Sequence, residues 1–191
     1  MEKKSFLLIS TLFLTPVRRW VNYSDENNNQ LDFKVLSFNN KVNKFGQEKV
    51  ENYVNSFDAD FVFLQEAGYQ KLGNPILQNL KFTAHNPIIS FYSKYEILES
   101  GSIPFVSNGD ALYADVKIKG NKIRFVNVYL EPFQLHKSMV KPSSNIDVNE
   151  EKARSLVRRF IPIFKIHQEQ VEILKDFVEK SPYPVILAGD F

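Results

Sequence analysis

The feature that most constrains this sequence is a short apolar run with no polar alternation. Residues 60–65 contain Phe61-Val62-Phe63-Leu64 in succession. Because successive side chains of a β-strand point to opposite faces, a run of this kind is typical of a strand that is buried on both faces. The run therefore predicts a strand in the interior of a layered fold.

Further strands are expected on both sides of this run. The sequence predicts short strands over residues 33–38 and 88–92. Residues 111–118 alternate between apolar and polar, Lys119-Gly120-Asn121-Lys122 has turn chemistry, and residues 123–130 form the expected return strand. This arrangement predicts a β-hairpin.

Helical spacing marks two other segments. Val50, Val54 and Phe57 predict an amphipathic helix over residues 47–57. A polar loop is expected over residues 137–150, and a helix that begins or kinks near Pro162 follows it. This second helix has a stripe of residues that step by three and four: Phe160, Phe164, His167, Val171, Leu174 and Val178. A last strand over residues 185–188 completes an α/β pattern with mixed sheets.

Composition limits the class of protein. The 191 residues suit one domain, and 43% hydrophobic residues with a mean hydropathy of −0.27 indicate a soluble globular chain. A net charge of +2 does not favour non-specific nucleic-acid binding. The sequence has no cysteine, which excludes disulfides, thiol catalysis and Cys-ligated zinc.

The N-terminal residues form a separate segment. Lys3 and Lys4 precede the apolar residues 6–14, which are too few for a membrane-spanning helix of about 20 residues. A secretory signal, the remnant of a membrane anchor and a segment packed on the domain all remain open. The polar residues 24–30 predict a linker, so we expect a segment over residues 1–30 and a domain over residues 31–191.

Polar residues follow the predicted strands at their ends, where site residues are often found. Asn39 closes the first strand, Glu66 follows the buried apolar strand, Tyr129 lies near the end of the hairpin, and Asp190 closes the last strand. A carboxylate next to an apolar strand is costly without a partner such as a cation. Glu66, Asp190 and a neutral Asn together offer the hard oxygen ligands that suit Mg²⁺.

The local sequences and their order resemble the successive motifs of the endonuclease/exonuclease/phosphatase superfamily. The resemblance covers residue 31 to the last residue, and its specific parts are Leu64-Gln65-Glu66 and Gly189-Asp190-Phe191. It implies a four-layer α/β/β/α sandwich with mixed β-sheets. It also implies a Mg²⁺-dependent phosphoester hydrolase, with Mn²⁺ as the alternative ion.

The resemblance implies a role for each strand-end residue. Glu66 is expected to bind the metal, Asn39 to contact the metal or the substrate phosphate, and Tyr129 to donate a hydrogen bond to that phosphate. Asp190 is expected to orient and activate the attacking water. Tyr129 stands at the position where most members of the family have His and abasic-site endonucleases have Tyr. The residues around Tyr129 nevertheless resemble those of the His-bearing subgroup. We therefore do not infer a role in DNA repair.

The family pattern continues beyond Phe191 with an Asn, further strands and a late Asp-His pair. We therefore expect a partial sandwich without its final strands and an active site that is incomplete in these residues. None of His85, His136 and His167 is expected to replace the missing histidine. The alternatives are a catalytically inert remnant that binds phosphate or metal weakly, and a membrane-tethered binding module.

The substrate class is expected to be a phosphoester of a nucleic acid, a phosphoinositide or a phospholipid. The sequence favours a monomer, with membrane association through the N-terminus. A membrane-associated or exported location is favoured over a cytoplasmic one.

Overall fold

The computed structural model describes residues 33–67, 79–105 and 107–191. The predicted segment over residues 1–30 lies outside these ranges, so its role stays a prediction. In chain order the described residues form β1 (Val35–Asn39), α2 (Gln47–Ser56), β2 (Phe61–Gln65), β3 (Phe82–His85), β4 (Ser90–Ser93), β5 (Ile97–Ile103), β6 (Asp110–Ile118), β7 (Asn121–Tyr129), α3 (Lys137–Val140), α4 (Ile146–Glu179) and β8 (Val185–Asp190).

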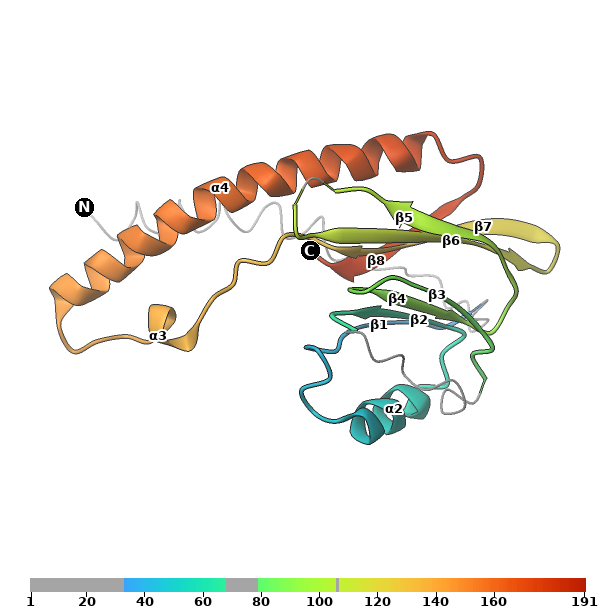
Figure 1. Cartoon of the computed structure of the whole chain (residues 1–191), viewed down its shortest axis with the longest axis horizontal. Helices are drawn as coiled ribbons and strands as arrows, with labels where there is room; N and C mark the ends of the chain where they lie inside the picture. Colours follow the sequence, from blue (N-terminus) through green and yellow to red (C-terminus); the bar gives the residue numbers. More distant parts are fainter. Residues whose placement is uncertain (1–32, 68–78, 106) are drawn as a thin grey trace, which may run out of the picture. The chain divides into compact units, whose positions relative to one another are not determined.

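The strands form two sheets (Figure 1). One sheet has the order β1-β2-β4-β3, and the other has the order β5-β6-β7-β8. In the first sheet β1 runs parallel to β2, and in the second sheet β7 runs parallel to β8, while the other pairings are antiparallel. Both sheets are therefore mixed, as the sequence predicted.

The packing confirms the four-layer α/β/β/α arrangement. Helix α2 places Val50 and Val54 against Val62 and Leu64 on the outer face of the first sheet. Helix α4 places Leu174 against the outer face of the second sheet. The inner faces of the two sheets pack on each other, so β2 lies between two apolar layers. This is why residues 61–64 have no polar position.

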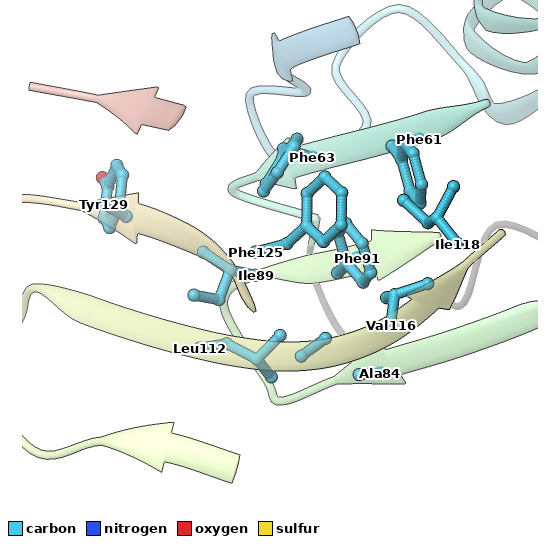
Figure 2. Packing of buried hydrophobic residues seen from close by; sticks show 11 residues of the cluster. Phe61, Phe63, Ala84, Ile89, Phe91, Leu112, Val116, Ile118, Phe125 and Tyr129 are labelled. Carbon is cyan, nitrogen blue, oxygen red and sulfur yellow. The ribbon is translucent and has the colours of Figure 1, made fainter. Parts of the chain in front are cut away.

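The core between the sheets is aromatic (Figure 2). Phe61 of β2 and Phe125 of β7 stack across the two sheets with ring centroids 4.2 Å apart. Phe91 of β4 lies beside both rings, at 6.0 Å from Phe61 and 5.4 Å from Phe125. Such pairs hold facing sheets in a fixed relation, because each ring loses its packing if the sheets slide.

The predicted hairpin is confirmed, because β6 and β7 pair from Ile118↔Asn121 to Asp110↔Tyr129. The predicted polar loop over residues 137–150 is wrong in part. Residues 137–140 form α3, and α4 begins at Ile146, where the Asn145 side chain accepts a hydrogen bond from the Asp147 N–H at 2.8 Å. Helix α4 neither begins nor ends at Pro162, which is exposed inside it.

Among the described residues, none of the helices combines the length and the apolar character that crossing a membrane requires.

Candidate active site

Four strand ends from the two sheets meet at one edge of the molecule. β1 and β2 are parallel, with Asn39 paired to Gln65, so Asn39 and Glu66 lie at neighbouring carboxyl ends. β7 and β8 are also parallel, with Tyr129 paired to Asp190. The four site residues that were predicted from the sequence therefore come from both sheets.

Hydrogen bonds connect all four of these side chains. The Asn39 amide nitrogen donates to Glu66 Oε1 at 3.0 Å and to Asp190 Oδ2 at 2.6 Å. The Tyr129 hydroxyl donates to Glu66 Oε1 at 3.2 Å. Since Glu66 and Asp190 share one nitrogen, these two carboxylate oxygens lie no more than 5.6 Å apart. The predicted convergence is thus observed, while the role of each residue stays a prediction.

The orientation of the Asn39 amide bears on its predicted role. Its oxygen accepts a hydrogen bond from the Lys41 N–H at 2.9 Å, so its nitrogen faces the two carboxylates. In this orientation Asn39 is a hydrogen-bond donor at the site. It would have to turn its amide to offer an oxygen to a metal ion.

The backbone at Glu66 explains how this side chain reaches the site. Gln65 points between the sheets, where it contacts Asn127 of β7, so regular alternation would point Glu66 to the outer face beside Leu64. Glu66 instead has a φ of 47°, in the left-handed region that is uncommon for a residue with a Cβ. This conformation ends the alternation and lets the carboxylate contact Tyr129. Backbone strain of this kind often occurs at functional sites.

The position of Asp190 depends on a glycine. Gly189 has a φ of 156°, and a Cβ at this position would lie 2.0 Å from the Val128 carbonyl oxygen. The absence of a side chain therefore lets β8 approach β7 closely enough for Asp190 to lie next to Tyr129.

The Tyr129 hydroxyl is held in its protonated form. Burial, followed by the nearby Glu66 carboxylate, raises the pKa of Tyr129 from 10.0 to about 12. The hydroxyl can therefore donate a hydrogen bond across the neutral pH range. It cannot serve as a base there, which agrees with the role predicted for it.

A buried polar contact between the sheets lies directly behind the site, and the sequence analysis did not identify it. Gln65 and Asn127 are each 1% exposed. Gln65 Nε2 donates to Asn127 Oδ1 at 2.7 Å, and Asn127 Nδ2 donates to the carbonyl oxygens of Leu64 at 3.1 Å and Ser90 at 2.9 Å. A polar residue within an otherwise apolar strand was the available signal for both residues.

Asp110 is a further carboxylate at this edge that the sequence analysis missed. The strand register places Asp110, Tyr129 and Asp190 side by side on β6, β7 and β8. Burial raises the pKa of Asp110 above 3.8, against the opposing effect of a hydrogen bond from Asn86. The predicted hairpin, with strands over residues 111–118 and 123–130, would instead place position 110 opposite position 131. The observed two-residue turn between Ile118 and Asn121 shifts this register and brings Asp110 opposite Tyr129.

A cavity of about 240 Å³ opens beside the four residues. Glu66, Tyr129 and Asp190 are among its polar lining residues, and Phe133 and Leu135 are among its apolar ones. His167 of α4 also lines it. His167 Nε2 lies 2.7 Å from the Glu131 carbonyl oxygen, and because a carbonyl only accepts, this nitrogen carries the proton.

Helix α4 fixes the chain just after Tyr129. Gln170, which is 1% exposed, accepts from the Glu131 N–H at 3.0 Å and donates to Ser107 Oγ at 2.8 Å. The Glu131 carboxylate in turn accepts from the backbone and side-chain nitrogens of Asn108. These contacts hold one wall of the cavity in place, and no sequence pattern identified them.

The donor set fits Mg²⁺ by its chemistry. Within the described ranges no three His, Asp or Glu side chains lie close enough together to hold a metal ion. Mg²⁺ is usually bound through one or two carboxylates, with water and substrate oxygens as its other ligands. Glu66 and Asp190 meet that requirement.

Searches of protein-family models and of curated proteins found no match for this chain. Solved structures match its fold. D. rerio TDP2 in complex with a single strand DNA product aligns with a TM-score of 0.55 and 18% identity, over 83% of this chain and 60% of that chain. A β-hairpin deletion mutant of Staphylococcus aureus β toxin gives a TM-score of 0.54 and 17% identity, over 84% and 67% of the two chains. Sphingomyelinase C from Streptomyces griseocarneus gives 0.51 and 17%, over 83% and 63%.

These matches show which fold the chain has. It is the α/β sandwich expected from the resemblance to the endonuclease/exonuclease/phosphatase superfamily, and the matched proteins share it at low sequence identity. The chain spans about three fifths of the length of D. rerio TDP2.

Proposed function

We propose that this chain carries the site of a Mg²⁺-dependent phosphoester hydrolase of the endonuclease/exonuclease/phosphatase superfamily. The observation that carries the proposal is the contact of Glu66 and Asp190, from different sheets, with one nitrogen of Asn39. Structural residues rarely bring two carboxylates together at an open edge without a cation to bind, because like charges repel. The fold of the matched structures agrees with this class of enzyme.

Each side chain has a role that its geometry allows. Glu66 holds the metal, and Asn39 donates to the substrate phosphate or to the carboxylates beside it. Asp190 is exposed and accepts the proton of the attacking water. Tyr129 donates to a phosphoryl oxygen with a hydroxyl that stays protonated. A bound Mg²⁺ supplies positive charge to the phosphoryl oxygens as negative charge develops on them. Mn²⁺ offers the same octahedral oxygen chemistry.

The proposed substrate is defined only by its chemical class, a phosphoester. One matched structure contains a single strand DNA product, and another is a sphingomyelinase. Nucleic acid and phospholipid therefore both remain candidate substrates, together with the phosphoinositides that the sequence resemblance suggests.

Hydrolysis of bis(p-nitrophenyl) phosphate by the purified chain tests the proposal. Where the purified chain releases p-nitrophenol, we expect the release to require Mg²⁺, to stop with EDTA, and to fall at least about 100-fold in the Glu66→Gln variant. Glu169→Gln changes the same functional group on an exposed face of α4 and is the matched control. Equal rates for Glu66→Gln and Glu169→Gln would remove Glu66 from the reaction.

Metal binding separates the enzyme from the inert remnant. If the unchanged chain does not hydrolyse the probe but binds Mn²⁺ with an affinity that falls in Glu66→Gln, the chain is a binding remnant at this site. If neither activity nor binding depends on Glu66, both interpretations of the site are wrong.

A further inference from the structure

One part of α4 carries a run of positive charge without any acidic residue. Residues 152–165 contain five Lys or Arg and no Asp or Glu. The whole chain carries a net charge of +2, so the remaining residues carry a net charge of −3. Acidic residues resume immediately outside this stretch, with Glu150 and Glu151 before it and Glu169 after it.

This stretch is also the part of α4 that leaves the core. The buried residues of the helix are Gln170 and Leu174, both in its C-terminal half. In Figure 1 the N-terminal half of α4 extends beyond the strands, with α3 beside it. Three apolar side chains within residues 152–165 are more than half exposed, with 56% for Val157 and 53% for both Ile161 and Phe164.

Apolar and basic residues form adjacent rows on this surface. Val157, Ile161 and Phe164 follow the i, i+4, i+7 spacing of one helix face. Arg154, Arg158 and Lys165 form a second row beside the apolar one. The two rows are about 100° apart around the helix axis, which is the rotation from one residue to the next. We name these six residues the cationic helix face.

The cations of this face are available for a partner. Arg154 pairs with Glu150 at 2.8 Å, but the two side chains are 70% and 61% exposed, so the pair is weak and exchangeable. Arg158 and Lys165 are exposed. The other two basic residues of the stretch are not counted, because Lys152 donates to the Lys141 carbonyl and Arg159 donates to the carbonyls of Phe133 and Gln134.

We propose that the cationic helix face docks this protein on an anionic lipid surface. An amphipathic helix at a bilayer buries its apolar row at the acyl boundary, while Lys and Arg reach the phosphates. A nucleic acid would engage the cations but offer nothing to the aliphatic side chains of Val157 and Ile161. The proposal is independent of the hydrolase activity and concerns α4, not residues 1–30.

The face is continuous with the cavity of the candidate site. Phe164 packs against Phe133 with ring centroids 5.4 Å apart, and Phe133 lines the cavity together with Glu66 and Asp190. Docking through α4 would therefore place the cavity close to the lipid surface.

Flotation with lipid vesicles tests the proposal on the full chain. We expect binding to vesicles of phosphatidylcholine and phosphatidylserine that weakens at high salt and is absent with phosphatidylcholine alone. Each cation near such a surface contributes roughly fivefold to partitioning, so Arg158→Glu/Lys165→Glu should lower binding by at least about 25-fold. The variant Lys49→Glu/Lys81→Glu makes the same charge change at exposed positions elsewhere and should bind within a few-fold of the unchanged chain.

Three results would overturn the proposal. The first is equal vesicle binding by Arg158→Glu/Lys165→Glu and the unchanged chain, which would assign binding to another segment, such as residues 1–30. The second is binding to a single-stranded oligonucleotide without binding to vesicles. The third is a dimer in sedimentation that dissociates in Ile161→Gln/Phe164→Gln, which would make the face a contact between two copies. Circular dichroism of each variant checks that the fold is retained.

Discussion

Replacing Asn127 by Leu tests whether the buried polar contact between the sheets holds the site together. The two side chains have similar size, so the substitution changes polarity more than volume. It removes three hydrogen bonds, from Gln65 and to the carbonyls of Leu64 and Ser90. The Gln65 amide and two carbonyl oxygens would then lose a partner in a region where Gln65 is 1% exposed.

The expected loss of stability follows from the polar groups that would be left without a partner. A buried polar group without a partner costs about 1–3 kcal/mol. Gln65 retains a long bond of 3.3 Å to Ser37 Oγ, and the Leu side chain contributes some apolar burial. We therefore expect Asn127→Leu to lower the free energy of unfolding by about 3–6 kcal/mol, a large part of the 5–15 kcal/mol typical of a domain.

Urea denaturation followed by circular dichroism measures this change, and the midpoint should fall by roughly 2 M. Ser37→Ala removes only the long bond and should cost less than about 1 kcal/mol. The double variant Gln65→Leu/Asn127→Leu should be more stable than the two single changes predict, because neither partner is left alone. A loss below 1 kcal/mol for Asn127→Leu would refute the idea that this contact connects the sheets.

Three further changes test other parts of the structure. Gly189→Ala should move β8 away from β7, because the added Cβ would lie 2.0 Å from the Val128 carbonyl oxygen. The Mg²⁺ affinity, measured by titration calorimetry, should then fall at least about tenfold as Asp190 is displaced. An unchanged Mg²⁺ affinity would contradict this reasoning. The folded-state pKa of Tyr129, about 12, lies above the ordinary 10.0, so its stabilising contribution is complete below pH 10 and is lost as the pH rises toward 12. Denaturation of the unchanged chain and of Tyr129→Phe across that pH range should show a steeper loss for the unchanged chain, and parallel curves would oppose the assignment. Asn145→Ala removes the cap at the start of α4 and should lower the free energy of unfolding by about 1 kcal/mol, as measured by denaturation. An unchanged free energy of unfolding would show that the helix start does not depend on this hydrogen bond.

The sequence predicted those parts of the fold whose signals are local. The strand over residues 61–65 was evident because both of its faces are covered, and the hairpin was evident because its strands and turn are contiguous. Strands β3 and β5 were missed because most of their side chains are not buried, which weakens the alternation of apolar and polar residues. Only Ala84 is buried in β3 and only Ile103 in β5.

The start of α4 was misplaced for a different reason. Pro162 normally ends or kinks a helix because it has no N–H for the carbonyl four residues before it. Here Pro162 is exposed, where water can satisfy that carbonyl, and Asn145 caps the helix far upstream. The polar composition of residues 137–150 concealed the cap.

The four candidate site residues were predictable because each lies at the end of a strand. Their supporting contacts were not, because these depend on how distant segments pack. Gln170 reaches the backbone of Glu131 only because α4 crosses the second sheet. The φ of Glu66, which turns its side chain toward Tyr129, is likewise a property of the folded chain.

Titration with Mn²⁺, followed by its electron paramagnetic resonance signal, tests the central claim most directly. We predict one bound ion per chain, with an affinity that falls at least about tenfold in both Glu66→Gln and Asp190→Asn, because Glu66 is the proposed ligand and the negative charge of Asp190 lies beside the ion and attracts it. Unchanged Mn²⁺ binding in either variant would show that the two carboxylates do not form a common cation site.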